Sequence, residues 1–329
     1  MLPKSIITTL ASLVCLGASA FAQSGSVAKV RAQLAQSSTH SAAGRTFSGR
    51  LVNPRGQKLE VAGPPALFTG AFVNHGTFKT TETTVTFRGA YTEMGSYVSD
   101  PSTNYFTDLL IGTTGTLTGG LGDRFIVSGN FFNGSLQNTT WSTGSAELAF
   151  SGGAAHSMSL AGTDAGATFL GYVNNFAWGI LRLAPGQSLT LSDGNATAGA
   201  ALYTQKLILE GGVAQIAAIT GNGFSIYYNP DDTANAYLGG LTYPLTGGGA
   251  VLPVAAVVKI TAITRLASGH TLLQGLGVPS RSHTVQASPD LIVPFAFLAN
   301  VTAAADGTFQ FEDVNAASFM ERFYRIIFP

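Results

Sequence analysis

The stretch Gly70-Ala71-Phe72-Val73-Asn74-His75-Gly76 returns in looser form as Gly129-Asn130-Phe131-Phe132-Asn133-Gly134. A segment rich in Thr and Ser follows each copy, and then comes a strand with alternating side chains, Val85–Gly89 or Leu148–Gly152. A unit of this kind presents only a few apolar side chains on one face, so it must stack on its neighbours to bury them. The repeat therefore predicts an all-β chain built around a parallel β-solenoid.

The composition agrees with short strands separated by corners. Glycine supplies 40 of the 329 residues, and charged residues supply only 10%. Glycine and asparagine suit corners because they tolerate positive φ. We expect an aliphatic interior with Thr and Ser facing solvent. The positions predicted to point inward are Leu109, Ile111, Leu117, Phe125, Val127, Leu181, Leu183, Leu189, Leu207, Leu209 and Ile216.

The first 22 residues have the layout of a secretory signal peptide. Lys4 precedes an apolar run from Ile6 to Ala18, and Ala20-Phe21-Ala22 provides a small-x-small cleavage site. The apolar run is shorter than a membrane span requires, and no later stretch is long and apolar enough to be one. We expect export and cleavage after Ala22, which removes the only cysteine, Cys15. The mature chain is expected to be secreted or held at the cell surface, without a transmembrane segment.

Three further regions follow the signal peptide. Residues 23–65 read as a polar leader and N-terminal cap, and residues 66–254 read as the solenoid. Gly247-Gly248-Gly249 marks the change to residues 255–329, where short strands about ten residues apart predict a small antiparallel β-sandwich. The strands predicted there are Val258–Ala262, Thr271–Gln274, His283–Ala287, Phe295–Val301, Thr308–Phe311 and Arg322–Phe328.

Charge and motif content favour a non-enzymatic protein. The chain has 17 Lys and Arg against 17 Asp and Glu, which gives no broad positive field for nucleic acid. Its five histidines show none of the spacings of a zinc site. It contains no Gly-x-Ser-x-Gly elbow, and its glycine-rich segments lack the lysine of a phosphate loop. We therefore assign no catalytic residue and no cofactor.

One turn is a candidate for calcium. Its carboxylate and amide oxygens are the ligands that calcium prefers. An ordinary Asn/Pro/Asp turn explains the same residues. The candidate ligands are Asn229, Asp231, Asp232 and Asn235.

Aromatic residues supply a weak signal for glycan binding. Trp178, Tyr227 and Tyr228 could stack on sugar rings if they were exposed. Large aromatic side chains are more often buried, so packing in the core or at a corner is the alternative.

Two other functions remain open on this scaffold. Acidic and basic residues along one face could act as a polysaccharide lyase, provided that they converge. Threonines two apart, as in Thr84-Val85-Thr86 and Thr116-Leu117-Thr118, could order water on an ice-binding face. The lyase candidates are Arg88, Asp100, Asp108, Asp123 and Arg124.

Several segments resemble a secreted β-strand-repeat family of environmental bacteria, similar to autotransporter-associated repeats and PEP-CTERM surface proteins. They are Phe176–Gly179, Gly186–Asn195, Ala201–Tyr203 and Ile226–Asn229. The C-terminal run from His283 to Leu291, with Gly307–Asp313 and the ending Arg322-Phe323-Tyr324-Arg325, looks like the small β-domain that closes such chains. The chain departs from the PEP-CTERM pattern in lacking the Pro-Glu-Pro signal, apolar helix and basic tail.

The resemblance implies a structural, adhesive or matrix role at the cell surface, with a surface polysaccharide or another envelope component as the expected partner. A carbohydrate-active enzyme or glycan-binding protein on the same scaffold is the first alternative, and an ice-binding solenoid is the second.

Overall fold

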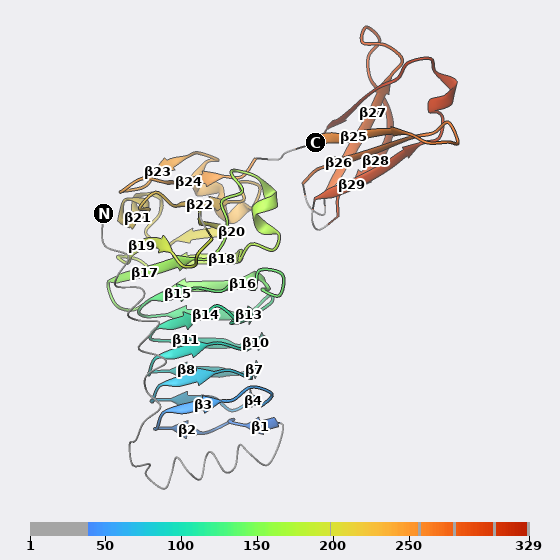
Figure 1. The fold of residues 1–329 in the computed structure, drawn as a ribbon. Coiled ribbons are helices and arrows are strands. Elements are labelled where there is room, and N and C mark those ends of the chain that lie inside the picture. Colours follow the sequence, from blue (N-terminus) through green and yellow to red (C-terminus); the bar gives the residue numbers. More distant parts are fainter. Residues whose placement is uncertain (1–38, 198, 256–257, 279–280, 305–306, 328–329) are drawn as a thin grey trace. The chain divides into compact units, whose positions relative to one another are not determined.

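The structure is a computed structural model that describes residues 39–329, apart from 198, 256–257, 279–280, 305–306 and 328–329. The predicted signal peptide (1–22) and the first part of the predicted leader lie outside the described residues. The described chain forms a parallel β-solenoid and, after it, two small antiparallel sheets (Figure 1).

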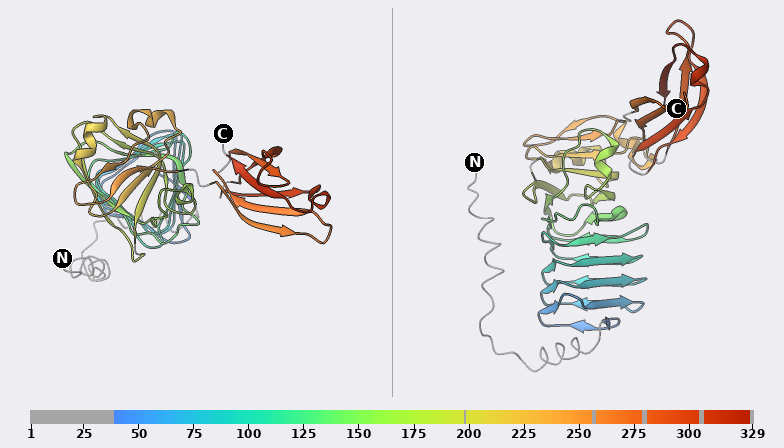
Figure 2. Two further views of the ribbon diagram at one scale, coloured as in Figure 1. Left: turned by 90° about the horizontal axis from the view of Figure 1, so that it is seen from above. Right: turned by 45° about the vertical axis from the view of Figure 1, so that its right-hand side comes forward.

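Three sheets form the solenoid, and the coils up to β15 contribute one strand to each of them, whereas later coils contribute strands to sheets B and C alone (Figures 1 and 2). Sheet A consists of β1 (Thr39–Ser41), β4 (Lys58–Ala62), β7 (Thr77–Thr81), β10 (Ser96–Asp100) and β13 (Thr116–Thr118). Sheet B consists of β2 (Thr46–Phe47), β5 (Ala66–Phe68), β8 (Thr84–Phe87), β11 (Thr103–Phe106), β14 (Arg124–Val127), β16 (Thr143–Phe150), β18 (Trp178–Leu183), β20 (Ala201–Leu209), β22 (Ser225–Tyr228), β24 (Ala250–Pro253) and β23 (Tyr243–Pro244). Sheet C consists of β3 (Leu51–Asn53), β6 (Phe72–Asn74), β9 (Tyr91–Glu93), β12 (Leu109–Ile111), β15 (Phe131–Asn133), β17 (Ala155–Leu160), β19 (Ser188–Asp193) and β21 (Ile219–Thr220).

Successive coils pair in parallel and in register. Phe72 lies beside Tyr91 on the next coil, and Asn74 lies beside Glu93. Apart from the antiparallel β23, every strand of the three sheets pairs in parallel, which confirms the predicted solenoid. Its first described coil begins at Thr39, earlier than the predicted start at residue 66. The start differs because the strands near Leu51 and Leu59 bury these side chains within a full coil instead of forming a separate cap.

The interior combines aliphatic and aromatic side chains. All eleven positions predicted to point inward are buried, with at most 5% of the side chain exposed. The expectation of an aliphatic interior is wrong for the early coils, where phenylalanines stack. Ring centroids are 4.7 Å apart between Phe47 and Phe68, 4.9 Å between Phe68 and Phe87, and 5.0 Å between Phe87 and Phe106. Stacked pairs of this kind add about 0.5–1.5 kcal/mol each to the effect of burial.

Glycines stack in a column at the corner after sheet C. A Cβ placed on Gly95 would overlap the carbonyl oxygen of Gly76, and one placed on Gly115 would overlap that of Glu93. Neither Gly95 nor Gly115 has a positive φ. Lack of space between coils therefore requires glycine here, whereas positive φ was the expected reason.

The coils lengthen toward the C-terminal end of the solenoid. One coil uses 19 residues between Asn74 and Glu93, and another uses 33 between Ser159 and Ser192. Much of the extra length is the segment 161–177, which leaves the coil between β17 and β18 and contains the short 3₁₀ helix η1 (Phe169–Tyr172). Later coils add η2 (Val213–Ala218) and η3 (Thr233–Leu238).

The C-terminal sheets each have three antiparallel strands. One contains β25 (Lys259–Arg265), β26 (Thr271–Leu276) and β29 (Thr308–Asp313), and the other contains β28 (Ala296–Thr302), β27 (Ser282–Ser288) and β30 (Phe323–Ile327). These six strands confirm the six that the sequence predicts, and η4 (Ala316–Ser318) precedes β30. Arg322 and Tyr324 of the Arg-Phe-Tyr-Arg ending both reach Asp313, through an ion pair of 2.9 Å and a hydrogen bond of 3.0 Å. The ending therefore links the two sheets.

Replacement of Gly95 by alanine tests the glycine column. The methyl group would meet backbone atoms of the coil below, so we expect Gly95→Ala to lower the free energy of unfolding by about 1–3 kcal/mol. Gly144→Ala is the matched control, because a Cβ there has no atom within 4 Å and its φ is not positive. Urea unfolding of both variants measures the difference. Equal stability of the two variants would contradict close stacking at this corner.

Candidate functional site

A hollow lies on the flank of the solenoid where the segment 161–176 leaves the coil. It has a volume of about 360 Å³ and is lined by three segments of the chain, 136–138, 161–176 and 195–197. These segments come from different coils, since they follow β15, β17 and β19 respectively. The hollow thus exists because one long coil returns beside two neighbouring ones.

Two asparagines hold the walls of the hollow together. Asn175 accepts a hydrogen bond from the backbone N–H of Thr163 at 2.6 Å and donates to the carbonyl oxygens of Thr163 and Gly171 at 2.8 and 3.0 Å. Asn195 donates to the carbonyl oxygens of Ser135 and Ala161, both at 3.0 Å. Hydrogen bonds within the chain therefore hold the three walls of the hollow in place.

The lining of the hollow is uncharged. Its twelve residues include four asparagines and two threonines, and none of them is acidic or basic. Leu136 and Leu170 contribute apolar surface with 51% and 43% of the residue exposed. The site therefore offers amide groups beside aliphatic carbon, without a formal charge.

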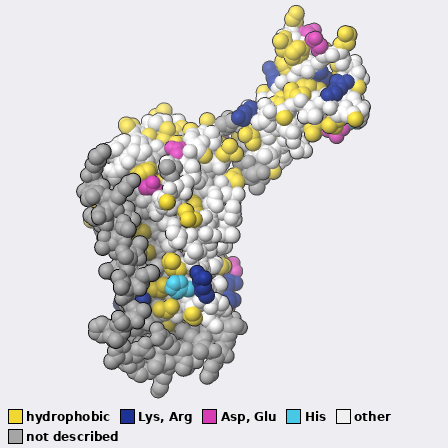
Figure 3. Space-filling view, viewed as in Figure 1, with side chains coloured by type: hydrophobic (Ala, Val, Ile, Leu, Met, Phe, Trp, Pro, Cys, Tyr) yellow, Lys and Arg dark blue, Asp and Glu magenta, His cyan; other side chains and the backbone are white. Residues whose placement is uncertain are grey.

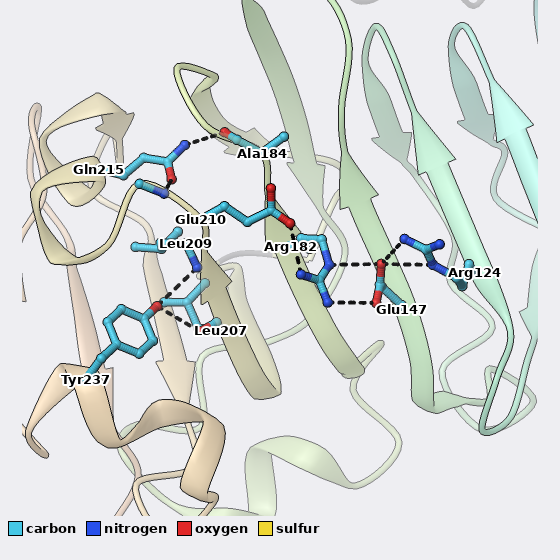
Figure 4. Close-up of polar contacts among 10 residues, drawn as sticks. Arg124, Glu147, Arg182, Ala184, Leu207, Leu209, Glu210, Gln215 and Tyr237 are labelled. Atoms are coloured by element: carbon cyan, nitrogen blue, oxygen red, sulfur yellow. Dashed lines mark hydrogen bonds and ion pairs between the residues drawn. The ribbon is translucent and has the colours of Figure 1, made fainter.

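A ladder of charges crosses neighbouring strands of sheet B (Figure 4). Glu147 on β16 lies between Arg124 on β14, at 2.9 Å, and Arg182 on β18, at 3.1 Å, and Arg182 also reaches Glu210 at 3.0 Å. Burial opposes ionisation of Glu147, but hydrogen bonds from Arg182 and Arg124 outweigh it and lower the pKa of this carboxyl. Each charge of the ladder is paired with an opposite one, so the ladder joins neighbouring coils.

The predicted lyase residues do not converge. Asp123 is buried and accepts hydrogen bonds from Ser99 and from the backbone of Ser102. Asp100 belongs to sheet A, Asp108 precedes β12 of sheet C, and Arg124 belongs to sheet B. Arg88 follows β8 of sheet B and is exposed. Arg88 and Asp108 thus lie at the corner between sheets B and C, whereas Asp100, Asp123 and Arg124 lie at the end of sheet A or the start of sheet B, so the five residues do not gather at one place.

Three of the four calcium candidates, Asn229, Asp232 and Asn235, already accept a hydrogen bond from a backbone N–H group. Asp232 accepts a hydrogen bond from the backbone of Ala234 and caps η3, and the buried Asn235 accepts one from the backbone of Leu207. Asn229 accepts from the backbone of Asp231. Among the described residues, no group of three or more His, Cys, Asp or Glu side chains could hold a metal ion. Calcium at this turn stays a prediction.

The predicted sugar-stacking rings lie inside the molecule. Trp178 and Tyr228 are 1% and 0% exposed, and Tyr227 is also buried. Trp178 packs edge-on against Phe125, and Tyr227 stacks on Tyr203 with centroids 4.6 Å apart. Because all three rings are buried, none of them offers a free face to a sugar. The threonine pairs proposed to bind ice lie on different faces, with Thr84 and Thr86 on sheet B and Thr116 and Thr118 on sheet A.

Glu93 is a carboxyl inside the solenoid. It accepts hydrogen bonds from Asn74 at 2.9 Å, from the hydroxyl of Tyr91 at 2.7 Å and from the backbone of Gly95 at 2.7 Å. Burial raises the pKa of Glu93 to about 8, although these hydrogen bonds oppose the shift. The side chain is completely buried, so it has no access to a substrate and affects folding instead.

The hollow leaves almost no trace in the local sequence. The only local signal was the pair Asn174-Asn175 within a stretch of 161–177 that lacks strand alternation. Its other walls come from residues that are distant in sequence, and the hydrogen bond between Asn195 and Ser135 joins positions 60 residues apart.

Comparison with protein-family models, with curated proteins and with solved structures finds no match for this chain. In the described part of the chain, no helix has the length and apolar character needed to cross a membrane.

The buried carboxyl makes stability depend on pH. Between the ordinary pKa of 4.5 and about 8, the folded chain holds a proton on Glu93 that the unfolded chain has released. The free energy of unfolding therefore falls as pH rises through this window, by up to about 1.4 kcal/mol per pH unit. Chemical unfolding at a series of pH values measures the fall. Glu93→Gln removes the titration and should flatten this part of the profile, and identical profiles for the two proteins would contradict the assignment.

Proposed function

We propose that this chain is an exported, non-enzymatic protein with a structural or adhesive role at the cell surface or in the extracellular matrix. The observation that supports the proposal best is the parallel register of the coils. Backbone ladders in three sheets make a rigid scaffold, and stacked repeats of this kind provide extended surfaces for contact.

The outer surface of the solenoid suits many weak contacts. Thr77, Ser96 and Thr116 form one outward column on sheet A, and Thr84 and Thr103 form another on sheet B. White, the colour of the backbone and of side chains that are neither apolar nor charged, covers most of the solenoid face that is visible in Figure 3. Hydroxyl groups on such a surface can exchange hydrogen bonds with water for hydrogen bonds with a hydroxylated partner.

An apolar end on the C-terminal sheets supports attachment to a lipid layer. Ser288 of β27 pairs with Phe323 of β30, so the segments that follow β27 and precede β30 lie at the same end of their sheet. Apolar side chains gather at one end of the C-terminal sheets in Figure 3. The apolar end consists of six exposed side chains, Leu291, Ile292, Val293, Val314, Phe319 and Met320.

The backbone of this apolar end is suited to a lipid environment. Asp290 accepts hydrogen bonds from the backbone N–H groups of Ile292 and Val293 at 2.8 and 2.7 Å, and Ser288 donates to the carbonyl oxygen of Val293 at 2.7 Å. Peptide groups that are already paired can enter hydrocarbon without the penalty of an unsatisfied donor. Met320 and Ile292 are the most exposed of the six, at 105% and 93%, so they would lose the most water on insertion.

Fractionation of the producing cells tests the proposal. We expect the chain in the cell-surface fraction and a loss of cell attachment when it is deleted. Combining Ile292→Asp with Met320→Glu should shift the protein into the medium, because both changes place a charge on the apolar end. Leu241→Asp is the matched control, since Leu241 is also exposed but belongs to the solenoid. A freely diffusing wild-type protein, together with normal attachment of the deletion strain, would overturn the proposal.

A further inference from the structure

We propose that the hollow lined by 136–138, 161–176 and 195–197 is a binding site for a neutral saccharide. The inference rests on the proposed adhesive function and names the chemistry of the partner. Four features carry it, namely backbone strain, free amide groups, apolar surface and the absence of charge from the twelve lining residues.

Backbone strain is concentrated at one wall. Asn174 and Phe176 have φ values of 48° and 56°, in the left-handed region. Asparagine enters this region readily, whereas a bulky residue such as phenylalanine is an outlier there. Phe176 stays in place because its ring packs edge-on against Trp141, with centroids 5.1 Å apart. Strained residues of this kind cost about 1–3 kcal/mol and cluster at ligand sites, where the surrounding structure fixes them.

The asparagines of the hollow divide into two roles. Asn175 and Asn195 are used by the backbone of the walls. Asn138 and Asn174 are exposed, and their amides make no hydrogen bond to the described residues. An amide both donates and accepts, and a sugar hydroxyl does the same, so the two groups can pair in either direction.

Apolar carbon lies beside these amides. Leu136 and Leu170 are exposed on opposite segments of the lining, and Val173 lies near Asn174 in the sequence. A pyranose ring carries hydroxyls at its edge and C–H groups on its face, which matches a surface of mixed amide and aliphatic character. At about 360 Å³, the hollow is at the small end of the usual range for ligand pockets and would hold roughly one or two sugar units.

The uncharged lining of the hollow determines which saccharides can bind there. A carboxylate or sulfate would lose water in the hollow without meeting a cation, which is unfavourable. Asp164, the neighbour of Thr163, is turned toward other partners, because it accepts hydrogen bonds from the hydroxyl of Tyr227 at 2.9 Å and from the backbone of Gly166 at 2.8 Å. The site therefore favours neutral sugars over uronates and sulfated glycans.

Direct binding to the mature chain tests the inference. The probes are neutral oligosaccharides from β-glucan, mannan, xylan and chitin, with oligogalacturonate and heparin fragments as charged controls. Saturation-transfer NMR and calorimetry should detect at least one neutral ligand and weaker binding of the charged ones. Asn138→Ala and Asn174→Gly should each weaken that binding about tenfold, because each removes hydrogen bonds while glycine keeps the left-handed backbone.

Asn315→Ala is the matched control, since Asn315 precedes η4 in the C-terminal sheets and makes no capping hydrogen bond. It should bind the neutral ligand as the wild type does, and the unfolding curves of all variants should agree. Three results would overturn the inference, namely no binding of any neutral probe, tighter binding of the charged probes, or unchanged affinity in both hollow variants. If neutral probes do not bind but the chain stays on the cell surface, the saccharide site is wrong and the proposed function stands. If neutral probes bind but the chain diffuses freely and attachment is normal, the saccharide site stands and the proposed function is wrong.

Discussion

Parallel pairing of each coil with the coils on either side is the constraint on which the solenoid depends. A coil of 19 residues is too short to enclose a core alone, so its apolar side chains are buried only by the next coil. Register then decides which residues meet. Phe68 lies beside Phe87 and Phe87 beside Phe106, and the rings stack because the backbones are in register. The glycine column has the same origin, because coils at strand spacing leave no room for a side chain at that corner.

The same register explains how polar groups are accommodated. Asn53, Asn74 and Glu93 occupy one column of sheet C, and each of the first two donates its amide hydrogen to the next side chain. On the outside of sheet B, the charge ladder also follows the stacking direction, from Arg124 to Glu147. The proposed binding site lies where the chain departs from this regular stacking. The segment 161–177 adds residues without adding a coil, and the hollow forms beside it.

The architecture could be predicted because glycine-cornered segments recur. The two stretches that suggested a repeat, 70–76 and 129–134, do lie on the same sheet, as parts of β6 and β15. A copy between them, Gly89-Ala90-Tyr91-Thr92-Glu93-Met94-Gly95, was missed because only its glycines and alanine match the first. If this copy is included, the number of residues in one coil and the stacking of phenylalanines on successive coils also become apparent. The C-terminal strands could be predicted from their alternation alone.

The sites could not be predicted in the same way. Both a sugar-stacking platform and burial were open for Trp178, Tyr227 and Tyr228, because whether a ring faces in or out depends on register and on the segment that covers it. The acidic residues of the lyase hypothesis are close in sequence, and the coil distributes them over different faces. The hollow needs contacts between three coils, so its asparagines carry no local signature.

Cross-linking between engineered cysteines tests the register most directly. Thr77 and Ser96 are partners on adjacent strands, so their backbones are about 4.8 Å apart. Asp100 lies on the same strand as Ser96 but pairs with Thr81, which places it roughly 14 Å from Thr77. The only native cysteine, Cys15, is replaced by serine. A short bifunctional thiol reagent should join cysteines at 77 and 96 and leave the pair at 77 and 100 unlinked. Equal cross-linking of both pairs, or none at 77 and 96, would contradict the stacked coil.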